Sequence, residues 1–182
     1  PYTNPEYEYK LAQNEIENCH LLVIGAGGFG CEILKDISLS GIKNIIVIDM
    51  DTIELSNINR QFLFKECDVG KSKSIIASKA IKDKIKDIKI TAYFNKIQDF
   101  DDECYLKFNM IICGLDSIEA RSWINNKIIQ IAKNKDLIIP IIDGGTEGFQ
   151  GSVKLIIPTI TACFECYKSL IPDKVTYPLC TL

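Results

Sequence analysis

Residues 20–39 read HLLVIGAGGFGCEILKDISL, and this stretch decides the fold. Leu21 to Ile24 form an apolar run, and the glycine-rich turn Gly25-Ala26-Gly27-Gly28-Phe29-Gly30 follows directly. A helical pattern then extends from Cys31 to Leu39. A strand, a glycine turn of this spacing and a helix are typical of a Rossmann unit, whose helix N-terminus presents backbone amides to a phosphate. The sequence therefore predicts a nucleotide site that includes Gly25, Gly27, Gly28 and Gly30.

Strands and helices continue to alternate after this unit. Four further apolar runs read as strands, at 44–48, 89–94, 110–113 and 138–143. Apolar positions at helical spacing predict helices near 75–85, 101–107 and 117–134. This pattern indicates an α/β fold with a Rossmann-like, mostly parallel sheet and helices on both faces. The run at 153–157 indicates one or two added antiparallel strands. We expect an arm over residues 1–18, helical in its second half and lying against the single domain of 19–182.

A block of polar residues after the second predicted strand restricts the kinds of nucleotide and reaction that fit the site. Asp49 ends the second predicted strand, where an acid can reach a ribose hydroxyl, and Asp51 follows it. Next come Ser56-Asn57-Ile58-Asn59-Arg60-Gln61 and Gly70-Lys71-Ser72-Lys73. Attack on an α-phosphate requires Arg, Lys and a metal-binding acid, because negative charge must be neutralised. An NAD-dependent oxidoreductase, the alternative for the glycine turn, has no role for Arg60 together with Lys73.

Composition argues against several classes of partner. The 182 residues carry a net charge of −3, with lysines dispersed along the chain, so no nucleic-acid partner is expected. No apolar run approaches the ~20 residues that span a bilayer, and no leader pattern opens the chain, so we expect no membrane partner. We therefore expect a cytoplasmic protein that can also enter the nucleus. The eight cysteines are expected to be reduced thiols in that setting.

Five motifs occur in an order that matches one known family: GAGGFG at 25–30, DMD at 49–51, SNINRQ at 56–61, GKSK at 70–73 and GLDS at 114–117. Together they resemble the adenylation domain of enzymes that activate ubiquitin-like proteins. The stretches 94–100, 142–149 and 177–181 are similar to the neddylation branch of that family. The SUMO-activating branch, the sulfur-carrier adenylyltransferases of the same fold and a noncatalytic partner subunit are the alternatives. The resemblance covers almost the whole chain.

The resemblance implies adenylation of a modifier's C-terminal glycine with ATP, followed by thioester transfer to Cys180. It implies that Asp49 holds the ribose, that Asp116 binds magnesium and that Asp51 assists the metal or Arg60. The residues that it places along the triphosphate are Asn57, Arg60, Gln61 and Lys73, with Arg60 and Lys73 as catalytic groups. It also implies three partners: the modifier, a regulatory subunit that completes a heterodimer, and a conjugating enzyme.

The pair Cys163 and Cys166 has the spacing of half a tetrahedral zinc site. A redox pair is the alternative, although such pairs begin a helix in a thioredoxin-like unit. The resemblance implies that the other two zinc ligands lie beyond Cys180, so we expect zinc only in a longer protein and a chain truncated at the start of the catalytic-cysteine region. His20 is the single histidine and precedes the first predicted strand, so we expect a structural role for it and no Cys-His dyad.

Overall fold

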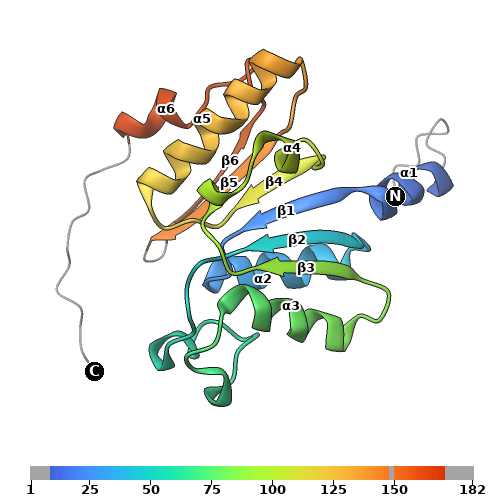
Figure 1. The fold of residues 1–182 in the computed structure, drawn as a ribbon, viewed down its shortest axis with the longest axis vertical. Coiled ribbons are helices and arrows are strands. Elements are labelled where there is room, and N and C mark those ends of the chain that lie inside the picture. The colour runs from blue at the N-terminus through green and yellow to red at the C-terminus, as the bar shows by residue number, and fades with distance from the viewer. Residues whose placement is uncertain (1–8, 148–149, 171–182) are drawn as a thin grey trace.

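The computed structural model describes residues 9–147 and 150–170 (Figure 1). Its centre is a six-stranded sheet in the order β3-β2-β1-β4-β5-β6. The strands are β1 (His20–Ile24), β2 (Asn44–Ile48), β3 (Lys89–Tyr93), β4 (Met110–Cys113), β5 (Ile141–Glu147) and β6 (Gln150–Ile156). All neighbours from β3 to β5 are parallel, and β6 pairs antiparallel with β5. The predicted fold class is confirmed.

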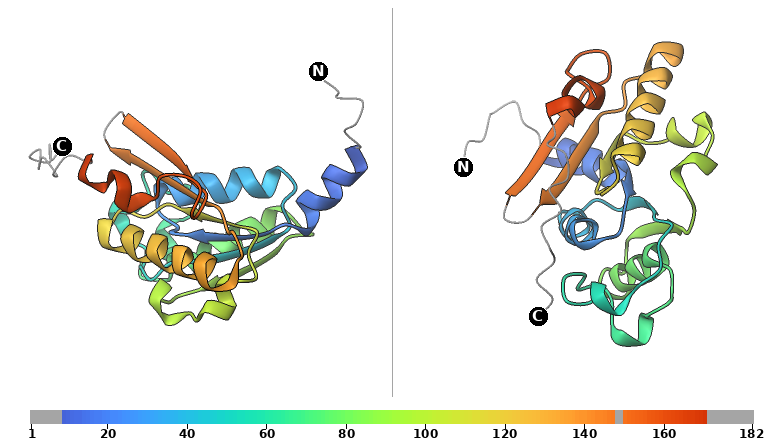
Figure 2. Two further views of the ribbon diagram at one scale, coloured as in Figure 1. Left: turned by 90° about the horizontal axis from the view of Figure 1, so that it is seen from above. Right: turned by 90° about the vertical axis from the view of Figure 1, so that its left-hand side faces the viewer.

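Helices cover both faces of this sheet (Figure 2). The α-helices of the described residues are α1 (Tyr9–Asn18), α2 (Gly28–Leu39), α3 (Lys73–Lys84), α4 (Asp102–Tyr105), α5 (Ile118–Lys135) and α6 (Phe164–Tyr167). Helices α2 and α3 pack on one face, and α4, α5 and α6 pack on the other. No helix in the described part of the chain is long and apolar enough to cross a bilayer.

Each face of the sheet has its own hydrophobic core. Leu22 and Ile24 of β1 belong to the core beneath α5, whereas Val23 belongs to the core beneath α2. This division follows from the strand geometry, because successive side chains point to opposite faces. A strand that is buried on both faces needs apolar residues at every position, which explains the continuous run at 21–24.

The arm at the N-terminus is helical where helix was expected. The C-terminal end of α1 is attached to the sheet, because the Asn44 side chain donates a hydrogen bond to the Glu17 carbonyl (2.9 Å) and Lys43 pairs with Glu17 (3.1 Å). Beyond this end, α1 extends away from the body of the molecule (Figure 2), so the expectation that the arm lies against the domain was wrong for residues 9–18, apart from the contacts of its C-terminal end. His20 is the first residue of β1 and is exposed; its Nδ1 lies 2.9 Å from the Asn18 carbonyl oxygen.

The bounds of several elements differ from the predicted ranges, and the differences in α3 and β5 have clear physical reasons. Helix α3 begins at Lys73, ahead of the predicted 75, because the Ser72 hydroxyl caps it by accepting a hydrogen bond from the Ile75 amide. Strand β5 runs three to four residues later than the predicted 138–143. Gly144 and Gly145 lie inside it, since pairing with Val153 and Ser152 of β6 keeps that backbone extended. The described residues after 145 contain one of the added antiparallel strands, β6.

Candidate nucleotide-binding site

The glycine turn lies where β1 and β4 end side by side, at the point where the strand order reverses. Gly25 has φ +95°, and a Cβ there would lie 2.5 Å from the Gly114 carbonyl oxygen. A Cβ on Gly30 would lie 2.0 Å from the Gly25 oxygen. Both glycines are therefore required by close backbone contacts. Crevices at this position of a parallel sheet are where nucleotides bind.

The N-terminus of α2 is open to a ligand. Its N-cap, Gly27, has no side chain to cap the helix, and a Cβ on Gly27 would have no neighbour within 4 Å among residues 9–147 and 150–170. The first-turn amides of a helix lack partners within the helix and carry partial positive charge. This end of α2 thus offers free donors beside empty space, which suits a phosphate.

Asp49 joins the end of β2 to the glycine turn. Its Oδ2 accepts a hydrogen bond from the Ala26 amide at 2.6 Å, and its Oδ1 accepts one from the Asp51 amide at 2.7 Å. Burial raises the pKa of Asp49, although both amide bonds oppose that shift. Each carboxylate oxygen keeps further acceptor capacity, so Asp49 can fix the turn and also accept from a ribose hydroxyl.

A short backbone pairing brings Lys73 to the same rim. The Lys73 amide donates to the Asp51 carbonyl (3.0 Å), and the Ile53 amide donates to the Lys71 carbonyl (2.8 Å). The Lys73 side chain is 11% exposed, and its Nζ lies 2.9 Å from Asp51 Oδ2. Lys71 is 53% exposed and pairs instead with Asp68 at 2.9 Å. The two lysines therefore point to different partners, with Lys73 beside Asp51 and Lys71 towards solvent.

The loop that carries Asn57, Arg60 and Gln61 returns to the glycine turn. A Cβ on Gly28 would lie 3.5 Å from the Arg60 carbonyl oxygen. The Arg60 side chain is exposed and donates to the Ser56 carbonyl at 2.7 Å. Asn57 is buried and its Oδ1 accepts from the Glu54 amide (3.1 Å), so it stabilises the turn. Gln61 is 3% exposed, and its Oε1 has no hydrogen-bond partner among the described residues.

Asp116 follows β4 and is exposed on the same rim. Within 9–147 and 150–170, its carboxylate makes no hydrogen bond or ion pair, and Ser117 rather than Asp116 caps α5 by accepting from the Ala120 amide (3.1 Å). The described residues contain no group of three or more His, Cys, Asp or Glu side chains that could hold a metal. One free carboxylate fits magnesium, which keeps several waters and is commonly held by one or two carboxylates and substrate phosphates.

The cysteine pair has the geometry of two zinc ligands. The sulfurs of Cys163 and Cys166 lie 3.6 Å apart as free thiols, close to the roughly 3.8 Å that Zn–S bonds of about 2.3 Å imply in a tetrahedron. Burial of Cys163 favours the neutral thiol, but hydrogen bonds from Cys166 and Asn125 outweigh it, so the pKa of Cys163 lies below its ordinary value. Cys180 lies outside the described residues.

Sequence reasoning missed two residues that shape this rim, Phe29 and Arg121. A Cβ on Gly144 would lie 2.3 Å from the Phe29 ring, and a Cβ on Gly145 would lie 2.5 Å from Arg121 Nη2. The signal was the Gly-Gly pair itself, since a glycine inside a strand often marks the close approach of another group. The roles assigned to Asn57, Arg60, Gln61, Lys73 and Asp116 stay predictions.

Comparison with known proteins places this site in a family. Residues 5–182 match the model of the ThiF family, and the chain belongs to that family. It is similar to two proteins named NEDD8-activating enzyme E1 catalytic subunit. The protein from Drosophila melanogaster is 50% identical over 90% of this chain and 38% of its own length. The one from Schizosaccharomyces pombe is 50% identical over 98% of this chain and 39% of its own length.

More distant relatives share the architecture. SUMO-activating enzyme subunit 2 of Dictyostelium discoideum is 37% identical over 93% of this chain and 25% of its own length. The crystal structure of E. coli MccB with ATP has a TM-score of 0.73 and 27% sequence identity, covering 86% of this chain and 46% of that chain. The chain thus spans about two fifths of the length of the NEDD8-activating relatives that it matches.

Proposed function

We propose that this chain is the ATP-binding part of an enzyme that adenylates the C-terminal glycine of a ubiquitin-like modifier, the neddylation modifier. The observation that carries the proposal is that Asp49 and the Arg60 backbone both lie against the glycine turn at the N-terminus of α2, with Lys73 held beside Asp51. Asp116 follows Gly114, which lies close to the same turn. The neddylation branch is favoured because two of its members are 50% identical to this chain over the aligned residues, against 37% for the SUMO-activating relative.

The proposed reaction joins a modifier carboxylate to the α-phosphorus of ATP and breaks the bond to pyrophosphate, giving an acyl-adenylate. Both reactants are anions, so the chain must lower their repulsion. The amides at the start of α2 and the guanidinium of Arg60 supply positive charge at the rim. Lys73 adds an ammonium that burial and Asp51 hold in one place. Preset charges of this kind stabilise a transition state without further reorganisation.

Asp116 is the residue that we propose to hold magnesium. Its free carboxylate stands at the end of β4, next to the turn that would receive the phosphates. Magnesium, when bound, would neutralise charge on the leaving pyrophosphate. Asp49 would orient the nucleotide by accepting from a ribose hydroxyl, which fits an acid at the end of the second strand. Gln61 Oε1 is a further buried acceptor, since it has no hydrogen-bond partner among the described residues.

The second proposed step transfers the acyl group to the Cys180 thiolate, which forms a thioester and releases AMP. This step, a regulatory subunit, a conjugating enzyme and a cytoplasmic and nuclear location are proposed from the resemblance of the sequence. Cys163 and Cys166 would supply two thiolates to a structural zinc ion whose other ligands lie in a longer protein.

Exchange of labelled pyrophosphate into ATP tests the proposed adenylation. The full-length protein would be assayed with its regulatory subunit and, in separate reactions, the neddylation modifier, SUMO or ubiquitin. We expect exchange with the neddylation modifier and its loss in Asp116→Ala. Exchange only with SUMO or ubiquitin would contradict the choice of branch. Tight NAD binding that ATP does not compete for, without exchange, would favour an oxidoreductase instead.

A further inference from the structure

Arg121 connects three separate parts of the candidate site. It stands in the first turn of α5, and its Nε and Nη2 both donate to the Leu115 carbonyl, at 3.0 and 2.7 Å. Nη2 also lies within hydrogen-bonding distance of the Gly144 carbonyl, at 3.3 Å. Leu115 immediately precedes Asp116 in the chain. One guanidinium therefore ties the backbone beside the proposed magnesium ligand to strand β5.

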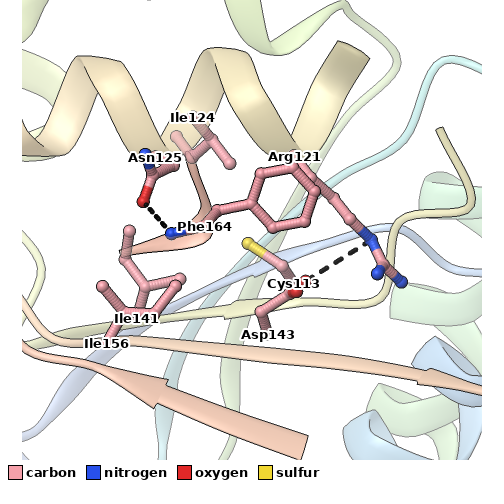
Figure 3. Close-up of a pocket in the computed structure, with 8 residues that line it drawn as sticks. All are labelled: Cys113, Arg121, Ile124, Asn125, Ile141, Asp143, Ile156 and Phe164. Carbon is pink, nitrogen blue, oxygen red and sulfur yellow. Dashed lines mark hydrogen bonds and ion pairs between the residues drawn. The ribbon is translucent and has the colours of Figure 1, made fainter. Parts of the chain in front are cut away.

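Two further side chains hold this guanidinium in place. Asp143 Oδ1 lies 3.5 Å from Arg121 Nε, and the Tyr167 hydroxyl donates to Asp143 Oδ2 at 3.3 Å. Figure 3 shows Arg121 and Asp143 pointing toward each other and joined by a dashed line; both line a small pocket together with Cys113 and Phe164. The Asp143 side chain is only 8% exposed, and Oδ1 has no hydrogen-bond partner among the described residues.

This buried ion pair is a poor way to stabilise the fold. Its two charges lose hydration, and well-packed apolar residues of similar volume often do as well or better. Most of the remaining lining is apolar or aromatic, with Ile124, Ile141 and Ile156 beside Phe164, and Asn125 adds a polar side chain. Gly145 also leaves room for the guanidinium, because a Cβ there would meet Arg121 Nη2 at 2.5 Å. The arrangement thus loses packing and solvation energy, and what it provides is a guanidinium that holds the Leu115 and Gly144 carbonyl groups.

Phe29 of the glycine turn also packs closely against the backbone at Gly114 and Gly144. A Cβ on Gly114 would lie 3.2 Å from Phe29 Cδ1, and a Cβ on Gly144 would meet the same ring at 2.3 Å. Phe29 belongs to the glycine turn and to the first turn of α2. The segment 114–116 is therefore fixed between Phe29 and Arg121, so its position relative to the phosphate-binding turn depends on both.

We propose that Arg121, oriented by Asp143 and Tyr167, is a positioning residue that sets the Asp116 carboxylate at the distance from the glycine turn which magnesium and the phosphates require. The proposal rests on the proposed function, because it takes Asp116 as the magnesium ligand. Arg121 touches neither metal nor nucleotide and acts through the Leu115 carbonyl. Loss of a group that orients a metal ligand without touching the metal commonly lowers metal affinity or activity by about 10-fold to 100-fold.

Three variants separate positioning from general stability. Arg121→Lys keeps the charge but cannot present two donors in a fixed fork. Tyr167→Phe removes only the hydroxyl that donates to Asp143. Lys127→Ala is the matched control, because Lys127 lies on the same helix and pairs with Asp102 rather than with the Leu115 segment. Thermal unfolding of all three would identify any loss of stability.

The magnesium concentration for half-maximal pyrophosphate exchange is the decisive readout. We expect it to rise about 10-fold or more in Arg121→Lys and about fivefold in Tyr167→Phe, the equivalent of one net hydrogen bond. At saturating magnesium, we expect the exchange rates of Arg121→Lys and Tyr167→Phe to recover. We expect Lys127→Ala to match the parent protein at all magnesium concentrations. An unchanged magnesium requirement in both Arg121→Lys and Tyr167→Phe would overturn the proposal.

Hydrogen exchange of the nucleotide-free protein tests the positioning without any activity. We expect faster amide exchange at residues 114–117 in Arg121→Lys than in Lys127→Ala. Equal exchange in the two variants would refute the positioning role even if the protein were not an adenylating enzyme. If the parent protein shows no exchange of pyrophosphate while the amides of 114–117 still respond, the proposed function and the magnesium role of Asp116 fail, and only the structural effect of Arg121 on residues 114–117 stands.

Discussion

Gly30 has no space for a side chain, and Gly30→Ala is expected to destabilise the protein strongly. A Cβ at this position would lie 2.0 Å from the Gly25 carbonyl oxygen and 2.8 Å from its carbon. Both are backbone atoms, so relief requires the glycine turn and helix α2 to move apart. Gly25 cannot easily move away from Gly30, because it already packs tightly against Gly114: a Cβ on Gly25 would lie 2.5 Å from the Gly114 carbonyl oxygen.

The size of the effect follows from this geometry. Overpacking a well-packed interior usually costs about 1–3 kcal/mol, and a clash with backbone on both sides belongs at the upper end. For a domain of this size, 1 kcal/mol corresponds to about 2–4 °C in the unfolding temperature. A loss of about 3 kcal/mol therefore predicts a decrease of roughly 6–12 °C.

Gly27→Ala is the matched control in the same turn. A Cβ on Gly27 would have no neighbour within 4 Å, and the residue has φ −76°, which alanine adopts freely. We expect its unfolding free energy to change by less than about 1 kcal/mol, since the smaller unfolded-state entropy offsets the weaker N-cap. Its methyl group would enter the space proposed for phosphate, so ATP affinity measured by calorimetry should still decrease. Thermal unfolding that shows equal stability for Gly30→Ala and Gly27→Ala would refute the close approach of α2 to the turn.

Two further predictions concern ionisable groups. Burial raises the pKa of Asp143 above its ordinary value of 3.8, so the fold favours the protonated acid and loses that stabilisation as pH rises through the raised pKa. Urea unfolding should therefore show Asp143→Asn gaining stability relative to the parent between about pH 4 and pH 7, whereas parallel pH curves would contradict this. Burial also raises the pKa of Cys31, to about 12, and that of Cys113, whereas Cys67 is exposed. Mass spectrometry after brief alkylation of the native protein should find Cys67 modified well before Cys31 or Cys113, and equal labelling would show that the two cores are open.

The parts of the fold that depend on local sequence could be predicted. Continuous apolar runs identified β1, β2 and β4 almost to the residue, because strands buried on both faces admit little else. The extent of β5 could not be predicted in this way. Gly144 and Gly145 usually interrupt strands, but here they admit Phe29 and Arg121, which come from elements distant in the sequence.

The candidate site also has parts that could be predicted from the sequence and parts that could not. The glycine turn and Asp49 follow from the position of a turn at the end of a strand, and the structure brings them into contact through the Ala26 amide. The resemblance to the family favoured Lys73 over Lys71, but the physical basis of that distinction, a backbone pairing with residues 51–53, is not visible in any local pattern. Arg121 was missed because its partners are the backbone carbonyl groups of Leu115 and Gly144. Every residue has such a group, so residue types do not identify the carbonyls that Arg121 contacts.

The comparison of Lys73→Ala with Lys71→Ala in modifier-dependent pyrophosphate exchange tests the adenylation site most directly. The two lysines are two residues apart and have the same chemistry, but Lys73 is largely buried and held by Asp51, whereas Lys71 is 53% exposed and pairs with Asp68. Removing one preset transition-state group typically lowers the rate about 100-fold to 1,000-fold. We predict a loss of that size for Lys73→Ala and less than about a twofold change for Lys71→Ala, whose exposed ion pair contributes little. Equal exchange rates in the two variants would contradict the placement of the triphosphate beside Lys73.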